Sequence, residues 1–300
     1  MTKDKKIGFI GLGAMGNPMA ANLARAGYEV LAYDVSPAAV NRLTEAVPSV
    51  KACDCVSSLA AASDIIFASL PNGAIVSSTM LGDTGVIPSC RENTIIVDLS
   101  SVAPETSKAM YREAARRHVS YMDAPVSGGV AGAAAGTLTL MAGGDQEAYE
   151  AVLPVMECIG KNIFYIGEIG SGDAMKIVNN LLLGCNMAAL AEALVLGEKC
   201  GLKVETMNRI LGISSGRSYA SEAKLSKFIM EDAYDGGFAI ALQRKDLGLA
   251  LEAARTEEMP LMMTSMASQI YQMAMAEQYS RQDISALVKM WCEHTGTEMK

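Results

Sequence analysis

The sequence predicts an α/β domain followed by an all-helical domain, joined by a long buried helix. Three observations lead to this prediction. Short apolar strands alternate with helices through the first half of the chain, beginning with a strand at 6–10 that runs into a glycine-rich turn. No strand pattern follows position 167, and an apolar run without proline covers 172–201. Because 300 residues are ample for two cores, we expect one domain over 1–167 and a second over 168–300.

The composition is that of an acidic and unusually apolar protein. Half of the residues are hydrophobic and the mean hydropathy is +0.21, so we expect surplus apolar helix surface to be buried between subunits. The net charge of −8 and the isoelectric point near 5.0 argue against a nucleic-acid partner and favour a cytoplasmic protein. No secretory signal pattern precedes the first strand.

The cysteines and histidines form no recognisable metal or disulfide pattern. The seven cysteines are scattered, and the spacing of Cys53 and Cys55 suits neither a zinc ribbon nor a redox motif. His118 and His294 are the only histidines, which leaves a zinc-dependent dehydrogenase poorly supported. We therefore expect no metal site.

The first strand and turn carry a nucleotide-binding motif. The strand at 6–10 runs into Gly11-Leu12-Gly13-Ala14-Met15-Gly16, then a helix, then a strand at 30–33. This is G-x-G-x-x-G in the context that a Rossmann dinucleotide-binding domain requires. The first glycine permits the turn, the second lets the backbone approach a pyrophosphate, and the third lets helix pack on strand. The helix N-terminus attracts the phosphates, so we expect the dinucleotide to contact residues 11–15.

Asp34 decides between the two nicotinamide cofactors. It follows the second strand, eighteen residues after Gly16. A carboxylate there accepts hydrogen bonds from the ribose hydroxyls and repels a 2′-phosphate. Val35 and Ser36 come next, with no arginine to bind that phosphate. NAD is therefore favoured over NADP, although Asp34 could instead cap the next helix.

Three further turns are candidates for ligand contacts. The strand at 64–70 ends in Leu70-Pro71-Asn72, and the strand at 94–98 leads to Ser101. Ligands of a doubly wound sheet lie beyond the carboxyl ends of its strands, so these residues are candidates for cofactor binding, with ordinary turns as the alternative. Ser127-Gly128-Gly129 precedes a strand at 137–142 and exposes successive backbone N–H groups. That suits a carboxylate, although a flexible turn is equally compatible.

The second half of the chain reads as helices only. After a strand at 163–166, the run at 172–201 would form a helix about 40 Å long, apolar on nearly every side and hence buried all round. A membrane span is disfavoured because asparagines and a glutamate interrupt the run and lysines flank it. The helices expected beyond it cover 203–213, 218–229, 240–256, 259–277 and 283–294.

Polar residues stand out against this apolar half. Lys176, Asn179 and Asn180 share one face of the long helix, and a lysine there is costly unless it is paired, neutral or facing a cavity. The alternative is a lysine whose ammonium group reaches solvent. Lys245, next to Asp246, and Arg217 in the loop 214–218 also merit attention, with a surface ion pair and a solvated loop cation as their alternatives.

Four motifs together resemble one family of enzymes. GFIGLGAMG, DAPVSGG, GDAMKIVNN and KDLGLAL occur in the order and spacing of the β-hydroxyacid dehydrogenases, which include 3-hydroxyisobutyrate dehydrogenases and tartronate semialdehyde (2-hydroxy-3-oxopropionate) reductases. The resemblance covers nearly the whole chain. The stretch from KIVNNLLLGCNMA to SSGRSYA is most similar to the 2-(hydroxymethyl)glutarate dehydrogenases.

The resemblance implies roles for most of the candidate residues. It makes Lys176 the catalytic lysine and Asn180, with Asn179 beside it, a substrate-binding residue. It assigns the substrate carboxylate to Ser127, Gly128 and Gly129, and implies that the helical domain pairs with a second copy in a homodimer or homotetramer. The cofactor contacts it implies after the glycine motif are Leu70, Pro71, Asn72, Ser101 and Lys245.

The implied reaction is the oxidation of a hydroxymethyl carboxylate to an aldehyde acid by hydride transfer to NAD, or the reverse. Burial and a cationic nicotinamide would lower the pKa of Lys176 toward the range of a useful base. Arg217 is a candidate for binding a second carboxylate. An imine reductase is disfavoured by Lys176, and a 6-phosphogluconate dehydrogenase would have an NADP site and a longer helical domain. A non-catalytic NAD-binding sensor is the alternative of another class.

Overall fold

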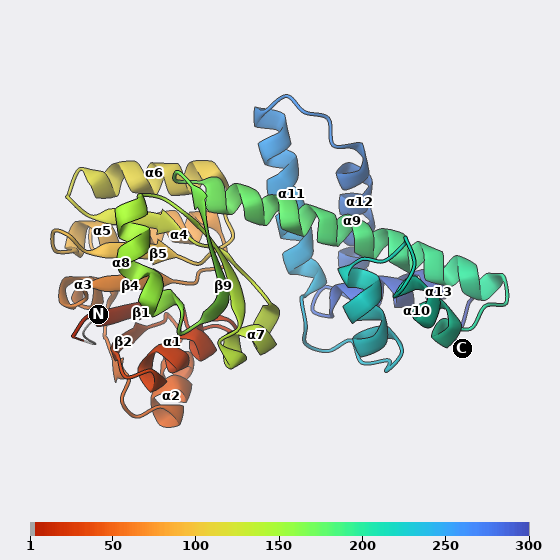
Figure 1. Cartoon of the computed structure of the whole chain (residues 1–300), viewed down its shortest axis with the longest axis horizontal. Helices are drawn as coiled ribbons and strands as arrows, with labels where there is room; N and C mark the ends of the chain where they lie inside the picture. The colour runs from red at the N-terminus through yellow and green to blue at the C-terminus, as the bar shows by residue number, and fades with distance from the viewer. Residues whose placement is uncertain (1–3, 300) are drawn as a thin grey trace. The chain divides into compact units, whose positions relative to one another are not determined.

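The chain consists of an α/β unit and a helical unit. The computed structural model describes residues 4–299, and its contacts divide the chain after Lys176 (Figure 1). The first unit is built on a nine-stranded sheet. Within the described part of the second unit the only β-pairing is an isolated bridge between Ala239 and Asp283. The predicted fold class is therefore confirmed.

The sheet has the strand order of a Rossmann domain. Six parallel strands run in the order β3-β2-β1-β4-β5-β6, and β8 pairs antiparallel with β6 and β7 and parallel with β9. The order reverses between β1 and β4, which places a ligand crevice at the carboxyl ends of these strands. The strands are β1 (Lys6–Ile10), β2 (Glu29–Tyr33), β3 (Lys51–Ala52), β4 (Ile65–Ala68), β5 (Ile95–Asp98), β6 (Ser120–Asp123), β7 (Val126–Ser127), β8 (Leu138–Gly143) and β9 (Gly160–Gly167).

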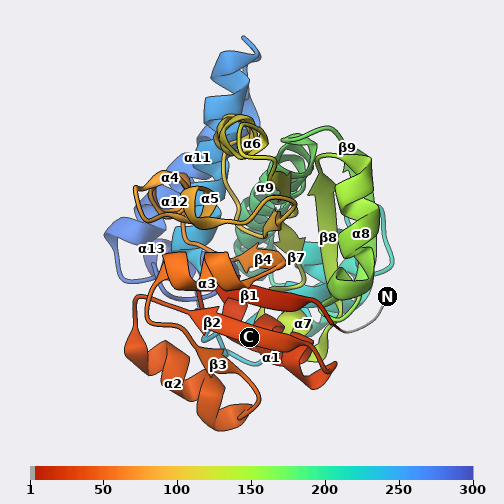
Figure 2. The ribbon, with the colours of Figure 1, turned by 90° about the vertical axis from the view of Figure 1, so that its left-hand side faces the viewer.

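Helices cover both faces of the sheet (Figure 2). Phe9 packs into the core on one face and the next residue, Ile10, into the core on the other. This burial on both sides explains why the strands read as continuous apolar runs. The helices of the first core are α1 (Gly16–Arg25), α2 (Pro37–Ala46), α7 (Gly129–Ala135) and α8 (Gln146–Met156); those of the second are α3 (Val56–Ala62), α4 (Gly73–Leu81), α5 (Val86–Ser89) and α6 (Pro104–Ala115).

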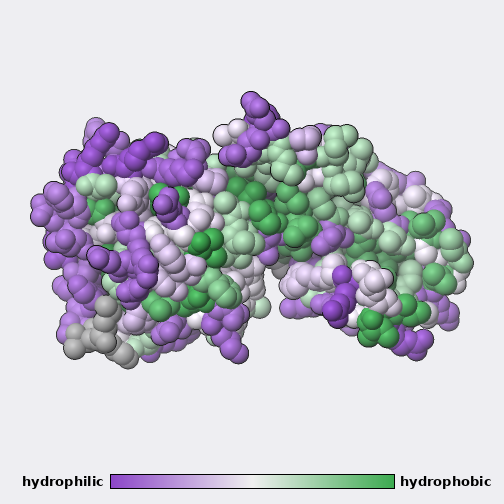
Figure 3. Space-filling model, turned by 45° about the horizontal axis from the view of Figure 1, so that its top comes forward, coloured by the Kyte–Doolittle hydropathy of each residue, from purple (hydrophilic) through white to green (hydrophobic). Residues whose placement is uncertain are grey.

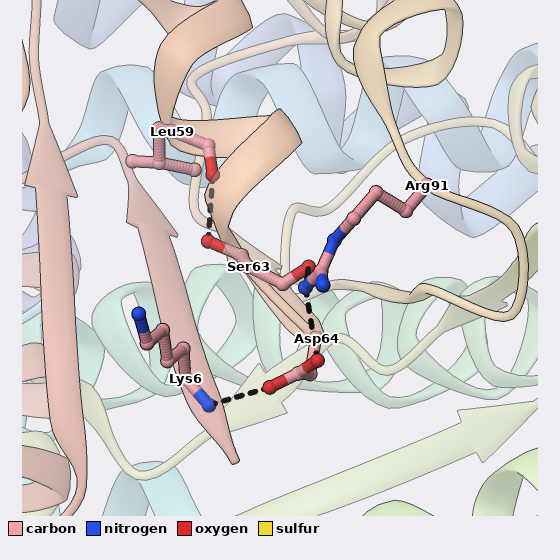
Figure 4. Close-up of polar contacts among 5 residues, drawn as sticks. All are labelled: Lys6, Leu59, Ser63, Asp64 and Arg91. Carbon is pink, nitrogen blue, oxygen red and sulfur yellow. Dashed lines mark hydrogen bonds and ion pairs between the residues drawn. The ribbon is translucent and has the colours of Figure 1, made fainter.

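A polar cluster ties the amino-terminal edge of the sheet together (Figure 4). Asp64, just before β4, accepts a hydrogen bond from the backbone N–H of Lys6 at 2.8 Å and another from Arg91 at 2.9 Å. Arg91 also donates to the carbonyl oxygen of Ser63 at 3.1 Å. Because ligands of such a sheet lie at the opposite, carboxyl edge, this cluster is structural.

The helical unit follows the predicted pattern with two local differences. Its elements are α9 (Ser171–Lys199), which begins in the first unit, then α10 (Val204–Leu211), η1 (Ala220–Ile229), α11 (Ile240–Thr256), α12 (Met262–Ala276), η2 (Ile284–Ala286) and α13 (Leu287–Thr295). The segment predicted at 218–229 is a π-helix, and the last predicted helix opens with a 3-10 turn. Buried Asp283 accepts hydrogen bonds from Lys224 and from the backbone N–H groups of Phe238 and Ser285.

The long helix α9 is not buried all round, so this expectation is wrong for one face. Leu194 is fully buried in the helical core, whereas Val178, Leu182 and Leu196 are 50%, 54% and 65% exposed. By length and composition α9 is the one described helix that could span a membrane, and half of its most apolar window is buried inside the protein. The apolar residues on the exposed face mimic the pattern of a helix buried on every side.

Candidate active site

The glycine loop after β1 has the geometry that its sequence predicts. Gly11 has φ = +89°, and a Cβ atom there would lie 2.3 Å from the carbonyl oxygen of Ser69. A Cβ atom at Gly16 would lie 1.8 Å from the carbonyl oxygen of Gly11, so helix and strand pack too closely for any side chain. At Gly13 a Cβ atom would meet nothing within 4 Å. The loop is therefore open where a pyrophosphate must approach.

The start of α1 is suited to phosphate. No side chain caps the helix, whose N-cap residue is Met15. The first N–H groups of a helix have no partner within it, and together with the helix dipole they attract anions. Leu12 is buried, whereas Gly13 and Ala14 are exposed. This part of the chain fits a dinucleotide.

Asp34 lies against the glycine loop. One carboxylate oxygen accepts the N–H of Leu12 at 2.6 Å, and the other accepts the N–H of Ser36 at 2.7 Å. These bonds fix the carboxylate beside the loop rather than on the first turn of α2, which begins at Pro37. A carboxylate has about four acceptor sites, so both oxygens retain capacity for ribose hydroxyls.

The turns after β4 and β5 are joined to each other. The N–H of Leu70 donates to the hydroxyl of Ser100 at 2.9 Å, and the N–H of Ser100 donates to buried Asp98 at 3.0 Å. Pro71 is exposed and Ser101 half-buried at the same edge of the sheet. Asn72 has a structural task, since its side chain accepts the N–H of Ile75 at 3.0 Å and caps α4.

Ser127, Gly128 and Gly129 form an open turn between β7 and α7. Ser127 pairs with Thr139 of β8, which anchors the turn to the sheet. Gly128 and Gly129 have φ values of +132° and +65°, conformations that residues with a Cβ atom rarely adopt. Both glycines are exposed, and a Cβ atom at Gly129 would meet nothing within 4 Å. The backbone of this turn is therefore accessible to a carboxylate.

Lys176 and Asn180 lie one turn apart on α9. Lys176 is 9% exposed and Asn180 is 2% exposed. Asn179 is half-buried at the edge of this face, and its side-chain amide donates to the side-chain oxygen of Asn180 at 2.9 Å. The helical spacing of the polar residues thus places a lysine and an asparagine on the same face, as predicted.

Two residues of α11 that the sequence did not single out as site residues hold Asn180. The side-chain amide of Asn180 donates to Asp246 at 2.5 Å, and Gln243 donates to the carbonyl oxygen of Asn180 at 2.8 Å. Asp246 also pairs with Lys245 at 3.2 Å and is nearly buried, so this is not a surface ion pair. The signal was the pair Gln243 and Asp246, three residues apart and hence on one helical face, of which only Asp246 belongs to the motif KDLGLAL. The Asn180 amide keeps one N–H and one lone pair available for a hydroxyl.

Arg217 lies in an exposed loop of the helical unit. Its N–H donates to the carbonyl oxygen of Ser214 at 3.1 Å. Its side chain is exposed and makes no hydrogen bond or ion pair with residues 4–299. Its neighbours Ile213 and Tyr219 are 83% and 62% exposed.

Across residues 4–299, no group of three or more His, Cys, Asp or Glu side chains could hold a metal ion, and the seven cysteines are free thiols. The candidate groups described above are the lysine of α9, side-chain amides and backbone N–H groups. This donor set suits proton and hydride transfer.

Family models match both units. A model described as the NAD binding domain of 6-phosphogluconate dehydrogenase matches residues 6–167. A model described as NAD-binding of NADP-dependent 3-hydroxyisobutyrate dehydrogenase matches residues 170–291.

Full-length relatives agree with these matches. The chain is 54% identical over 299 residues to a 2-(hydroxymethyl)glutarate dehydrogenase of Eubacterium barkeri, covering 100% of this chain and 99% of the relative. It is 39% identical to an NAD-dependent L-serine dehydrogenase of Pseudomonas aeruginosa, covering 96% and 98%. A solved structure of Mycobacterium tuberculosis 3-hydroxyisobutyrate dehydrogenase with L-serine has a TM-score of 0.89 at 32% identity, covering 96% and 99%.

The models span both units and the relatives span the whole chain, so the similarity is not confined to the nucleotide-binding fold. NAD binding and oxidoreductase activity follow from the same matches. The chain belongs to the 3-hydroxyisobutyrate dehydrogenase family and is an NAD-dependent β-hydroxyacid dehydrogenase.

Proposed function

We propose that this enzyme interconverts 2-(hydroxymethyl)glutarate and its aldehyde acid. The supporting observation is the 54% identity over the full chain to an enzyme of that name, against 39% for the L-serine dehydrogenase and 36% for mouse 3-hydroxyisobutyrate dehydrogenase. L-serine, 3-hydroxyisobutyrate and tartronate semialdehyde are the alternative substrates, and they belong to the same reaction class.

In the proposed reaction Lys176 moves the proton of the substrate hydroxyl. The oxidised carbon loses one hydride and its hydroxyl loses one proton; a bound NAD would supply the acceptor for the hydride. Lys176 is 9% exposed, and in its neutral form the amine accepts the proton of the hydroxyl. In the reverse direction the ammonium form returns the proton to the alkoxide.

Asn180 and the turn at 127–129 would orient the substrate. Asn180 is held on both sides by Asn179 and Asp246 and has one N–H and one lone pair left for the hydroxyl. The backbone N–H groups of the turn and the hydroxyl of Ser127 would bind the carboxylate next to the reacting carbon. The residues that would hold NAD are Gly11, Leu12, Gly13, Ala14, Met15, Asp34, Leu70, Pro71, Asn72, Ser101 and Lys245.

A substrate comparison tests the assignment. NADH formation is followed with 2-(hydroxymethyl)glutarate, 3-hydroxyisobutyrate and L-serine at matched concentrations. We expect kcat/KM to be at least about tenfold higher for the first, a difference of about 1.4 kcal/mol. A higher value for either of the other acids would reassign the substrate, and no turnover with any of them would favour a sensor.

Replacement of Lys176 tests the mechanism. We expect Lys176→Ala to lower kcat by about 10²- to 10⁴-fold, the usual contribution of a positioned acid or base, with NADH binding nearly unchanged. Lys199→Ala is the matched control, because Lys199 lies on the same helix but is exposed and donates to the carbonyl oxygen of Thr295. Turnover of Lys176→Ala within a few-fold of the native rate would remove the lysine from the mechanism.

A further inference from the structure

We infer that Asp123 is a positioning residue for catalysis: its carboxylate fixes the first turn of α9 and thereby the placement of Lys176. This inference rests on the proposed function, in which Lys176 moves the proton. Asp123 ends β6, is 1% exposed, and opens the DAPVSGG motif.

The Asp123 carboxylate caps α9 from outside the helix. One oxygen accepts the N–H of Gly170 at 2.7 Å, and the other accepts the N–H of Asp173 at 2.7 Å. Both donors belong to the helix start, where backbone N–H groups have no partner within the helix. In a capping box two side chains of the helix itself satisfy the corresponding pair of N–H groups. Gly170 precedes the helix and has no side chain, so the carboxylate of Asp123 on β6 accepts both N–H groups instead.

The packing around this carboxylate leaves it no freedom. A Cβ atom at Gly172 would lie 2.1 Å from the carbonyl oxygen of Met141 and 2.8 Å from Asp123. A Cβ atom at Gly143 would lie 2.7 Å from the other carboxylate oxygen. The two glycines thus let the helix start, strand β8 and the carboxylate meet at contact distance. These contacts fix the rotation of the start of α9 about the helix axis and its position along that axis relative to the sheet.

Lys176 lies close to the cap. It follows Asp173 by three residues, which is less than one turn and about 4.5 Å along the helix axis. A rotation or shift of the helix start therefore displaces Lys176 by nearly the same amount. Asp123 also lies four residues before Ser127 in the chain, so the same residue ties the proposed carboxylate-binding turn to the helix that carries the proton-transfer group.

The neighbouring strand supplies a matched control. Asp98 pairs in register with Asp123, ends its own strand and is also 1% exposed. It accepts the N–H of Ser100 at 3.0 Å and the hydroxyl of Tyr121 at 2.8 Å. These partners lie on the sheet and on the proposed cofactor turn. Replacement of Asp98 thus removes a buried carboxylate of equal placement without removing the two bonds to the α9 start.

The decisive experiment combines Asp123→Asn with Lys176→Ala. Asparagine keeps one acceptor and turns the other into a donor, so one of the two helix N–H groups faces an NH₂ group. We expect Asp123→Asn to lower kcat about 10²-fold, the effect of a misplacement of about 1 Å, while KM for NAD changes less than about threefold. In the Lys176→Ala background the same substitution should lower the residual rate less than about threefold, because residues that act through one group are not additive.

The pH profile of kcat supplies a readout that loss of folding would not imitate. Lys176 must be neutral to accept the proton, so its titration sets the acid limb of kcat for NADH formation, and altered placement of the amine should shift the apparent pKa of this limb in Asp123→Asn. In Asp98→Asn the apparent pKa of this limb should keep its native value, while KM for NAD rises. Should Asp123→Asn fail to fold, Asp123→Ser, which retains one acceptor and leaves room for water, replaces it in every arm.

Three outcomes would overturn the inference. They are a loss of kcat below about threefold with an unchanged pH profile, an equal loss in the native and Lys176→Ala backgrounds, and an equal shift of the pH limb in Asp98→Asn. If the residual rate of Lys176→Ala is too slow for a further decrease to be measured, the shift of the pH profile in Asp123→Asn tests the inference. An unimpaired Lys176→Ala enzyme would instead contradict the proposed function, so the two failures are distinguishable.

Discussion

Asp34 connects two parts of the nucleotide site that are distant in sequence. Its carboxylate binds the N–H groups of Leu12 and Ser36, so it is both a part of the glycine loop and a potential acceptor for ribose hydroxyls. This double task separates it from a helix cap. A substitution there changes the charge beside the ribose and the support of the loop at the same time.

Replacement of Asp34 should change cofactor preference. We expect Asp34→Ala to lower kcat/KM for NAD about 10- to 100-fold, since charged hydrogen bonds are worth about 1.5–3 kcal/mol, and to raise the relative efficiency with NADP. Asp34→Asn keeps one acceptor and removes the charge, so it separates repulsion of the 2′-phosphate from support of the loop. Equal kcat/KM for NAD and NADP in the native enzyme would contradict the role.

Arg217 is the candidate for the second carboxylate of the proposed substrate. Its exposed guanidinium has the fork geometry that binds a carboxylate through two hydrogen bonds. We expect Arg217→Ala to weaken kcat/KM by about 1.5–3 kcal/mol on 2-(hydroxymethyl)glutarate and much less on 3-hydroxyisobutyrate. Arg217→Lys keeps the charge without the fork. An equal loss on both acids, or none, would leave Arg217 a solvated loop residue.

The start of α9 contains a second buried carboxylate, whose ionisation affects the stability of the fold. Asp173 lies in its first turn, 1% exposed, with one oxygen accepting the hydroxyl of Ser107 at 2.6 Å and the other without a hydrogen-bond partner among residues 4–299. Burial, and then the charge of Asp123, raise the pKa of Asp173 well above its ordinary value of 3.8. The folded protein therefore binds this proton more tightly than the unfolded chain does.

The pH dependence of stability should reveal this proton. A raised folded pKa contributes stability that is complete below pH 3.8 and is lost as the pH rises through the folded pKa. Asn at this position cannot ionise, so we expect Asp173→Asn to gain Tm relative to the native protein as the pH increases from about 5 to about 8. Asp54→Asn, the same charge change at an exposed position, is the control. Parallel Tm curves for native protein and Asp173→Asn would contradict the prediction.

At the scale of the whole molecule, apolar residues gather on the helical unit (Figure 3). Met262, Met263 and Met266 of α12 are 79%, 74% and 64% exposed, and Leu196 of α9 is 65% exposed. An apolar surface of this kind is typical of a subunit interface. It supports our proposal of a homodimer or homotetramer formed through the helical unit.

Charged substitutions on α12 should weaken this assembly. We expect Met262→Glu combined with Met266→Glu to raise the dissociation constant at least about tenfold, because burial of each such side chain is worth about 1.5–3 kcal/mol. Light scattering during size-exclusion chromatography measures the mass. Leu81→Glu, at the end of α4 and 39% exposed, is the control. A native protein that is monomeric at micromolar concentration would contradict the proposal.

The sequence by itself determined the features that short segments encode. The turn at 11–16, with Asp34 after the next strand, predicted the Rossmann unit and NAD, because each glycine answers a local steric demand. Helical spacing placed Lys176 and Asn180 on one face, because 3.6 residues per turn hold along any continuous helix. The roles drawn from the family resemblance, including that of Lys176, stay predictions.

Only the tertiary structure decided which distant groups meet. Asp123 and Gly170 are 47 positions apart, and Asn180 and Asp246 are 66 apart, so no local pattern relates them. Strands β3 and β7 escaped prediction because two residues carry no periodicity, and β6 escaped because its four residues, SYMD, include only two apolar ones between polar ends. The exposed face of α9 escaped because apolar composition is the same whether a side chain is buried in its own unit or left for a partner. Periodicity reports which face of an element is apolar, and packing alone decides what covers it.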